Sequence, residues 1–579
     1  MKFSTKIVLP FSAIFPDEKP KSIQEYLKGI DRERLLKIGS FFLGFSHTDS
    51  KYSNPYDFMG MFFSKENAPL FKTSILNLER FLSDKNLNQS DVEIPYVISS
   101  LNLFEFAFEL QNRDDIKSEK DIEISVFKAY LLLNENSTSK YTHSINELEK
   151  KLPLHKLPAG LLLAQHLHNC DLTNYNIDKL FSTQFIRALM FFEFLGQRED
   201  CKVLLEEFYI YFGVSDYKDY LKRILPLSTN IINRTKESYT DIIMDDSATE
   251  KDFDFLDRLI INDIEVIEDF DFRNIRSKPL YKVSNGVYRF ISPLFAMESI
   301  YNGLYWKLKE INDKLSKTSK IKDLYGLKTY EFSEKFVLNS ILNDCFNLRY
   351  FTKTGDELEG KYDGAPDYYV RTTKSITIFE SKDIMLSAEI KQSIYFDEIE
   401  RTLVEKLYKK ADGTPKAVMQ LINNIIKILS GQLGFDSNYN LHELKINPVL
   451  VLHYRMFNVA GLNKFLNFWF QEELKILKDN GYDISKVSPL IIIDIDTLIF
   501  NKDAFVDQKI EIEDCLHEYQ ENYLNYTTNG KYFKNEQEAV QAAKNSYLPF
   551  ASFLDIKVDE MGLRGIPRDI KEKGYKIFD

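Results

Sequence analysis

The chain is poor in the features that mark several large protein classes. It has four cysteines in 579 residues and no CxxC pair, which argues against a disulfide framework or a structural zinc site and favours free thiols. No GxxxxGK[ST] or GxGxxG pattern occurs, so no NTPase site is expected. No apolar run reaches the ~18 to 20 residues that span a bilayer, and the N-terminal apolar run is broken by Pro10. We therefore expect a cytoplasmic protein that does not bind membranes.

The chain also lacks an excess of positive charge. It has 75 Lys and Arg against 87 Asp and Glu, a net charge of −12. A surface that is basic throughout is therefore excluded, and any phosphate binding must use a local basic groove, metal ions or a partner. The proportions of hydrophobic residues (44%) and charged residues (28%) are those of an ordinary globular protein.

The pattern along the chain predicts an α/β protein in which a mainly α-helical N-terminal region precedes a C-terminal domain. In that domain strands alternate with helices, which predicts a mixed central sheet flanked by helices. Asn285-Gly286, between two short strands, predicts a hairpin turn. The expected segments are a mixed α/β segment (1–110), a helical domain (111–250), a connecting hairpin and helix (251–319) and the C-terminal domain (320–579).

The most informative stretch is GAPDYYVRTTKSITIFESKD, residues 364–383. A strand that reads as buried, SITIF, ends in Glu380 and Lys382, and burying these charges is costly unless they are used. Residues two apart on a strand point to the same face, so Glu380 and Lys382 share one. Asp367 opens the neighbouring strand, and the spacing fits two strands joined by a turn at 372–375. The pairing predicts that Asp367 and Glu380 lie close enough to share an ion.

Two carboxylates and an amine in this arrangement suit phosphodiester hydrolysis. Carboxylate oxygens are ligands that Mg²⁺ prefers. The metal lowers the pKa of a bound water and offsets charge on the phosphate oxygens. A protonated lysine beside it can orient the water and stabilise developing charge.

These residues resemble the PD-(D/E)xK nuclease superfamily. The resemblance rests on Pro366-Asp367, on Glu380-Ser381-Lys382 and on the strand–turn–strand that carries them, and it covers residues 320–460. Members of the superfamily usually place a Glu on the helix before the hairpin, where this chain has Glu334. Many place a Gln on the helix after the third strand, where this chain has Gln420, which by the resemblance positions the metal-bound water or the nucleic-acid backbone.

The resemblance implies a restriction-endonuclease-like fold and a Mg²⁺- or Mn²⁺-dependent endonuclease that cleaves DNA. A nuclease domain behind a large helical region suits restriction or antiphage defence, which is an argument from architecture. By the same resemblance Asp367 and Glu380 bind the metal with help from the Ser381 carbonyl. Glu334 is a direct or outer ligand, and Lys382 is the catalytic amine. The helical N-terminal region is then a candidate site for a protein partner or for homo-oligomer formation.

Several alternatives stay open. The ExK pattern alone is weak, because it recurs at Glu389, Glu443 and Glu473. Asp363 competes with Asp367 as the ligand, although its place before Gly364 favours a turn. The charges could form a structural ion pair, the domain could be an inactive nuclease fold that binds a partner, or the substrate could be RNA.

Further charged residues extend the prediction. The basic residues that could contact nucleic acid near the site are Lys374 in the hairpin turn and, before the Gln420 helix, Arg401, Lys409, Lys410 and Lys416. An ordinary charged helix surface explains the second group equally well. A strand over PLIIIDIDTLIF carries Asp494 and Asp496, which are candidates for an accessory metal site, although a sheet edge or a turn explains them better.

Overall fold

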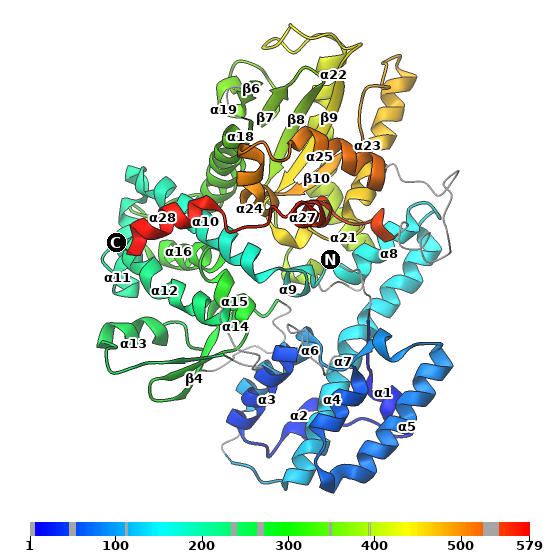
Figure 1. Ribbon diagram of the computed structural model, residues 1–579, viewed down its shortest axis with the longest axis vertical. Coiled ribbons are helices and arrows are strands. Elements are labelled where there is room, and N and C mark those ends of the chain that lie inside the picture. Colours follow the sequence, from blue (N-terminus) through cyan, green and yellow to red (C-terminus); the bar gives the residue numbers. More distant parts are fainter. Residues whose placement is uncertain are drawn as a thin grey trace. The chain divides into compact units, whose positions relative to one another are not determined.

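The computed structural model describes residues 6–45, 54–110, 114–232, 240–262, 271–346, 350–391, 393, 395–524 and 544–578. The chain is a mixed α/β protein (Figure 1). It forms two compact units, one of residues 144–208 and 307–579, the other of residues 2–143 and 209–306. This division differs from the four consecutive segments expected above, because residues 144–208 belong with the C-terminal part of the chain.

The unit that contains the C-terminal part is built on a five-stranded sheet. Its strands, in spatial order, are β10 (Ile491–Asp494), β9 (Lys445–Leu452), β8 (Ser375–Lys382), β7 (Tyr368–Arg371) and β6 (Phe351–Thr354). β6, β7 and β8 are antiparallel neighbours, whereas β8, β9 and β10 run parallel. β8 and β9 are buried almost throughout, as expected for strands covered on both faces.

Helices cover both faces of this sheet. Ile376 and Ile378 of β8 belong to a buried cluster with α21 (Phe396–Leu403), α22 (Ala417–Leu429) and α23 (Leu462–Asp479). On the opposite face the ring of Phe379 lies 6.0 Å from Phe346 of α18 (Leu338–Phe346). α18 continues η4 (Leu327–Val337), a π-helix that also contacts β8.

The remaining helices of this unit are α8 (Leu157–His166), α9 (Cys170–Thr173), α10 (Ile177–Gly196), η3 (Glu199–Cys201), α17 (Leu324–Gly326), α19 (Gly355–Leu358), α20 (Ala388–Lys391), η6 (Val404–Tyr408), η7 (Arg455–Phe457), α24 (Ile495–Val506), α25 (Ile512–Tyr519), η8 (Gln520–Leu524), α27 (Phe550–Glu560) and α28 (Arg568–Phe578). The boundary between the two units runs through α11 (Lys202–Phe212) and α16 (Asn302–Lys314).

Two of the predictions made for this domain can be compared with the structure. The hairpin predicted within residues 364–383 is confirmed, because β7 and β8 pair as antiparallel neighbours. The strand predicted over PLIIIDIDTLIF is wrong in its second half, because β10 ends at Asp494 and α24 follows from Ile495.

The other unit holds a three-stranded antiparallel sheet of β3 (Asp241–Ile243), β5 (Val287–Phe290) and β4 (Leu280–Ser284). The predicted turn at Asn285-Gly286 is confirmed, and Gly286 has φ +75°.

Every helix in the described part of the chain lacks the length or the apolar character that crossing a membrane needs. The other elements are β1 (Ile7–Val8), α1 (Phe11–Ile14), α2 (Ile23–Leu27), α3 (Arg32–Phe45), α4 (Pro55–Phe62), η1 (Lys65–Asn67), α5 (Ala68–Lys85), η2 (Gln89–Asp91), β2 (Val92–Glu93), α6 (Val97–Leu110), α7 (Glu119–Lys151), α12 (Tyr217–Ile232), α13 (Glu250–Asp257), α14 (Arg273–Ser277) and α15 (Pro293–Glu298).

Candidate functional site

The predicted carboxylates and lysine meet at the end of β8. Tyr368 pairs with Phe379 across the β7–β8 hairpin, so Asp367, one residue earlier, lies opposite Glu380. The Lys382 Nζ lies 2.6 Å from Glu380 Oε1 and 3.8 Å from Asp367 Oδ2. It also lies 4.0 Å from Glu334 Oε2. One ammonium is thus surrounded by three carboxylates.

Glu334 reaches this group from the π-helix η4. Its Oε1 accepts a hydrogen bond of 2.7 Å from the main-chain N–H of Asp383, the residue after Lys382. Turns of π-helix are rare and are often found at functional sites. Here the π-helix places a carboxylate over the end of a buried strand that comes from a later part of the chain.

Burial raises the pKa of each carboxylate in the group. The Glu380 side chain is 1% exposed, and its burial, with the nearby charge of Asp367, raises its pKa to about 8. Burial also raises the pKa of Glu334 to about 7, although Lys382 opposes the shift, and it raises the pKa of Asp367. The Asp367 side chain is 30% exposed, so the group is open to solvent on that side. The cluster carries more potential negative than positive charge, which favours a cation.

A second layer of buried polar groups holds the carboxylates in place. The Ser381 N–H donates to Asp367 Oδ2 at 2.7 Å, and the Ser381 hydroxyl lies 2.8 Å from His453 Nε2. The Lys328 Nζ donates to Asp383 Oδ2 at 2.6 Å. Burial by itself raises the pKa of Asp383, but Lys328, His453 and Arg187 together outweigh it and the pKa is lowered. Burial lowers the pKa of His453 to about 3, so its ring is neutral near pH 7.

Lys328, Asp383 and His453 were not predicted from the sequence as residues of this site. Asp383 directly follows the Glu-Ser-Lys motif, which was a usable signal. No sequence pattern marks Lys328 or His453, because each reaches the site from a distant part of the chain.

The residues present suit a cation held by two carboxylates. Among the residues that the structure describes, no three Asp, Glu, His or Cys side chains are arranged to hold one metal ion. Asp367 and Glu380 nevertheless face each other and offer hard oxygen donors, and Mg²⁺ is usually bound by one or two carboxylates together with waters. Glu334 turns one oxygen toward the Asp383 N–H, which suits an outer position better than a direct ligand.

The structure separates Asp363 from the carboxylate group. Asp363 is exposed, and its main-chain oxygen accepts a hydrogen bond from Lys427 on α22. It is Asp367 that lies within 4 Å of the Lys382 ammonium. Of the two aspartates that the sequence left open, Asp367 is the one placed opposite Glu380.

Gln420 lies near the start of α22, which packs against β8. Its main-chain oxygen accepts a hydrogen bond from Asn424. Its side chain makes no hydrogen bond within the described part of the chain. The role of Gln420, like that of the Ser381 carbonyl, stays a prediction.

The basic residues that were predicted to contact nucleic acid lie at two separate places in the structure. Lys374 precedes β8, at the opposite end from Lys382, and eight strand residues span about 26 Å. The expectation that Lys374 lies near the site is therefore wrong. Lys409, Lys410 and Lys416 flank a tight turn in which the Lys410 N–H donates to the Thr414 carbonyl at 3.0 Å.

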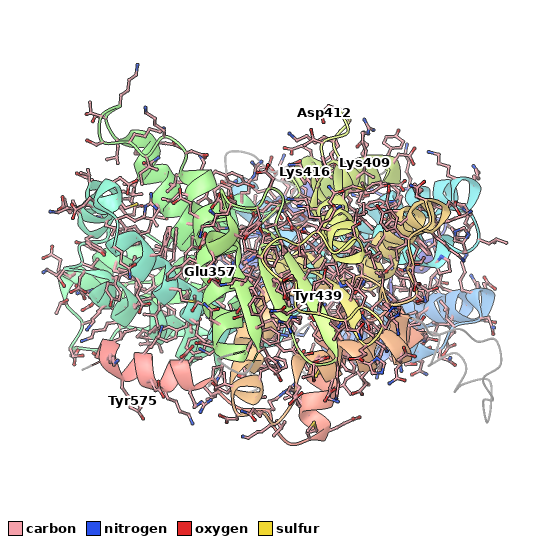
Figure 2. All side chains as sticks on the ribbon, turned by 90° about the horizontal axis from the view of Figure 1, so that it is seen from above. Glu357, Lys409, Asp412, Lys416, Tyr439 and Tyr575 are labelled. Carbon is pink, nitrogen blue, oxygen red and sulfur yellow. The ribbon has the colours of Figure 1, made fainter. Side chains whose placement is uncertain are left out.

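This turn, residues 409–416, projects from the surface, as the labels in Figure 2 show. The Lys409 Nζ lies 3.8 Å from Glu473, and Arg401 is exposed on α21. Whether these residues contact nucleic acid stays a prediction.

Asp494 and Asp496 do not belong to a group of three possible metal ligands among the described residues. Asp494 ends β10 and caps α24 by accepting the N–H of Asp496 at 3.3 Å. Asp496 lies 3.2 Å from the Arg187 guanidinium, which already provides a positive charge. Both carboxylates therefore have structural partners where β10 ends and α24 begins.

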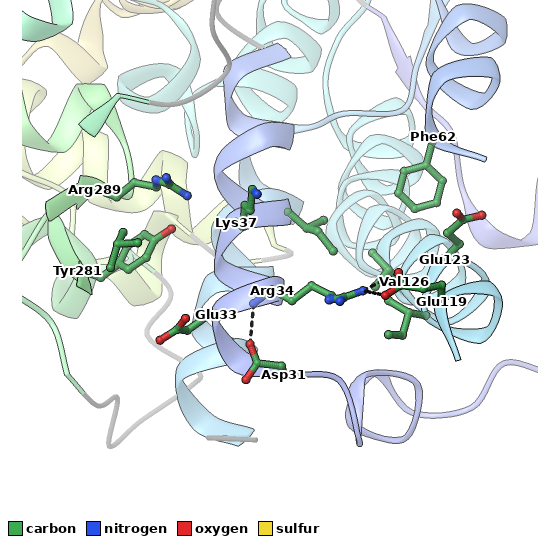
Figure 3. A pocket seen from close by; sticks show the side chains of 13 residues that line it. Asp31, Glu33, Arg34, Lys37, Phe62, Glu119, Glu123, Val126, Tyr281 and Arg289 are labelled. Carbon is green, nitrogen blue, oxygen red and sulfur yellow. Dashed lines mark hydrogen bonds and ion pairs between the residues drawn. The ribbon is translucent and has the colours of Figure 1, made fainter. Parts of the chain in front are cut away.

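The other unit contains a hollow of about 610 Å³ beside α3, α7 and the β4–β5 hairpin (Figure 3). Arg34, which lines it, lies 2.6 Å from Glu119 and 3.0 Å from Asp115. Arg289 binds both oxygens of Asp241, at 2.6 and 2.7 Å. Its arginines are thus neutralised by neighbouring carboxylates, and the hollow does not show a group of reactive side chains like the one on β8.

Comparisons with protein-family models, curated proteins and solved structures found no match to this chain. A function can therefore be argued only from the residues and their geometry.

Proposed function

We propose that the chain is a metal-dependent nuclease that hydrolyses phosphodiester bonds of DNA at the end of β8, on a restriction-endonuclease-like fold. The proposal is supported above all by the position of Asp367 opposite Glu380 across the hairpin, with the Lys382 ammonium 3.8 and 2.6 Å from their oxygens. Structural ion pairs need one partner, whereas this ammonium has three carboxylates around it.

Each residue has a part in this mechanism. Asp367 and Glu380 would hold Mg²⁺ or Mn²⁺, which supplies a water of lowered pKa and neutralises phosphate charge when bound. Burial alone lowers the pKa of Lys382, but the charges of Glu380, Asp367 and Glu334 outweigh it and raise the pKa. Lys382 therefore stays protonated and acts as a hydrogen-bond donor to the attacking water or the developing phosphate charge.

The setting we propose is restriction or antiphage defence, in which the unit of residues 2–143 and 209–306 meets a trigger, a protein partner or a second copy of the chain. This part of the proposal rests on the presence of a second large unit, which is an argument from architecture.

A cleavage assay on supercoiled, linear and single-stranded DNA, with and without Mg²⁺ or Mn²⁺, tests the function. Cleavage is expected only with metal, and Asp367→Asn and Lys382→Ala should abolish it while circular dichroism stays unchanged. Asp363→Asn is the matched control, because this exposed carboxylate lies four residues away and should be dispensable. Full cleavage by Lys382→Ala would refute the mechanism.

The short Lys382–Glu380 ion pair of 2.6 Å also favours a second candidate, an inactive nuclease fold that binds a partner. Metal binding separates the two, because a ligand at 100 times its Kd stabilises the fold by about 2.7 kcal/mol. A catalytic site predicts this shift with Mn²⁺, and a closed ion pair predicts none. An RNA substrate is tested by the same cleavage assay with RNA.

A further inference from the structure

A basic loop leads directly into the π-helix that carries Glu334. The loop, residues 315–322, joins α16 to α17 and is held by the buried Asn312 amide, which bonds the Ile321 N–H at 2.9 Å and the Ile321 carbonyl at 3.0 Å. Two of its exposed lysines, Lys317 and Lys322, form no ion pair with any residue that the structure describes. A fixed loop thus presents two positive charges to solvent.

Two exposed tyrosines follow this loop. The Tyr325 and Tyr330 side chains are 49% and 45% exposed. The Tyr330 ring is held in place, since its hydroxyl donates to Glu359 at 3.0 Å and the Lys335 Nζ lies 4.4 Å from the ring centroid. The Tyr325 hydroxyl makes no hydrogen bond among the described residues. Both tyrosines are therefore about half exposed, and only the face of the Tyr330 ring away from Lys335 is open to a ligand.

These tyrosines adjoin the carboxylate group. Lys328, three residues after Tyr325, is buried and binds Asp383 at 2.6 Å, whereas Tyr325 itself is exposed. Asp383 follows Lys382 in the chain and donates its N–H to Glu334. Burial raises the pKa of Tyr325, and the negative charge of Asp383 adds to the shift, as expected for a hydroxyl beside this network.

The carboxylates near the two tyrosines are already engaged. Asp323 caps α17 by accepting the Gly326 N–H at 2.8 Å. Glu331 pairs with Arg198 at 2.6 Å, and Glu359 pairs with Lys335 at 2.5 Å. The charges of Lys317 and Lys322 are consequently available to an anionic ligand.

We propose that Lys317, Lys322, Tyr325 and Tyr330 form a binding surface for a single strand of nucleic acid that leads to the carboxylate group. Unpaired bases stack on exposed aromatic rings, whereas a duplex hides the faces of its bases, and lysines neutralise the phosphates between them. The proposal rests on the proposed nuclease function and defines its substrate: a strand with unpaired bases at the point of cleavage.

Fluorescence anisotropy of labelled oligonucleotides tests the surface, with full-length protein carrying Asp367→Asn to prevent cleavage and with Mg²⁺ present. Tyr325→Ala and Tyr330→Ala should each weaken single-strand binding about 5- to 160-fold, the range for losing one stacked base. Tyr325→Phe keeps the ring and should bind normally. Tyr575→Ala, at an exposed tyrosine on α28, is the control and should also bind normally (Figure 2).

The lysines are tested through salt dependence. Replacing Lys317 and Lys322 together by Gln should reduce the slope of log Kd against log salt by about 1.4, since each phosphate contact on a single strand contributes about 0.7. Lys571→Gln on α28 is the control and should leave the slope unchanged.

The binding surface and the nuclease function can fail separately. Equal or tighter binding of duplex, or normal single-strand binding by both alanine variants, would overturn the surface even if wild-type protein cleaves DNA. Conversely, binding that depends on the tyrosines in a protein that cleaves neither DNA nor RNA would uphold the surface and refute the nuclease.

Discussion

Removal of the Lys382 ammonium is the most direct test of the charge arrangement at the end of β8. Lys382→Met keeps a long side chain but leaves the buried Glu380 carboxylate without the partner that now lies 2.6 Å away. Removing one member of a buried ion pair costs about 3–5 kcal/mol. We expect the free energy of unfolding to fall by about this amount at pH 8, where the neighbouring carboxylates are most ionised.

The fall in the free energy of unfolding that Lys382→Met causes should be smaller at lower pH. A carboxyl whose pKa is higher in the folded than in the unfolded state loses stability as pH rises between the two values. Burial raises the pKa of Glu380 to about 8 and that of Glu334 to about 7. The raised pKa of Lys382 keeps the wild-type ammonium charged throughout pH 6–8. The difference in the free energy of unfolding between the wild type and Lys382→Met should therefore be larger at pH 8 than at pH 6.

Urea unfolding followed by near-UV circular dichroism measures this difference. Lys353→Met is the matched control, because Lys353 pairs with Glu357 at 2.8 Å but is 32% exposed, and a surface pair contributes about 0–1 kcal/mol. Added Mg²⁺ should stabilise the Lys382 variant by replacing the lost positive charge. The reasoning is refuted if Lys382→Met loses no more stability at pH 8 than Lys353→Met does.

Two further predictions concern the carboxylates and their support. Because burial and the charge of Asp367 raise the pKa of Glu380 to about 8, this carboxyl becomes more ionised between pH 6 and pH 8, and Mn²⁺ affinity measured by calorimetry should rise over this range. An affinity that does not change with pH would contradict the assignment. His453→Phe removes the hydrogen-bond partner of the Ser381 hydroxyl. The variant should lower Mn²⁺ affinity or cleavage about 10- to 100-fold while circular dichroism stays unchanged. Normal affinity and cleavage would show that this hydrogen bond does not support the site.

The hairpin was predictable from local pattern, whereas the edge strand β6 and the point at which β10 ends were not. β7 and β8 carry apolar runs around a turn, and these are recognisable in the sequence. β6, Phe351–Thr354, is half-buried at the sheet edge and has no apolar run. Residues 495–500 read equally well as strand or helix, and the Asp494 side chain, which accepts the Asp496 N–H, starts the helix.

The basic contacts show a limit of reasoning along the chain. Lys374 is seven residues from Ser381 in sequence, yet an extended strand puts it at the far end of β8. Lys317 and Lys322 are much more distant in sequence from Glu380, and no local pattern connects them with it. η4, which follows their loop, contacts β8 in the folded chain.

The sequence by itself determined that Glu380 and Lys382 share a face and that Asp367 can lie opposite them, because side chains alternate along a strand with a period of two. The tertiary structure decided which other groups meet there. Lys328, Glu334 and His453 come from a helix before the hairpin and from the residue after β9, and packing of distant segments places them. No local pattern specifies such a meeting, since it depends on which elements cover the end of the sheet.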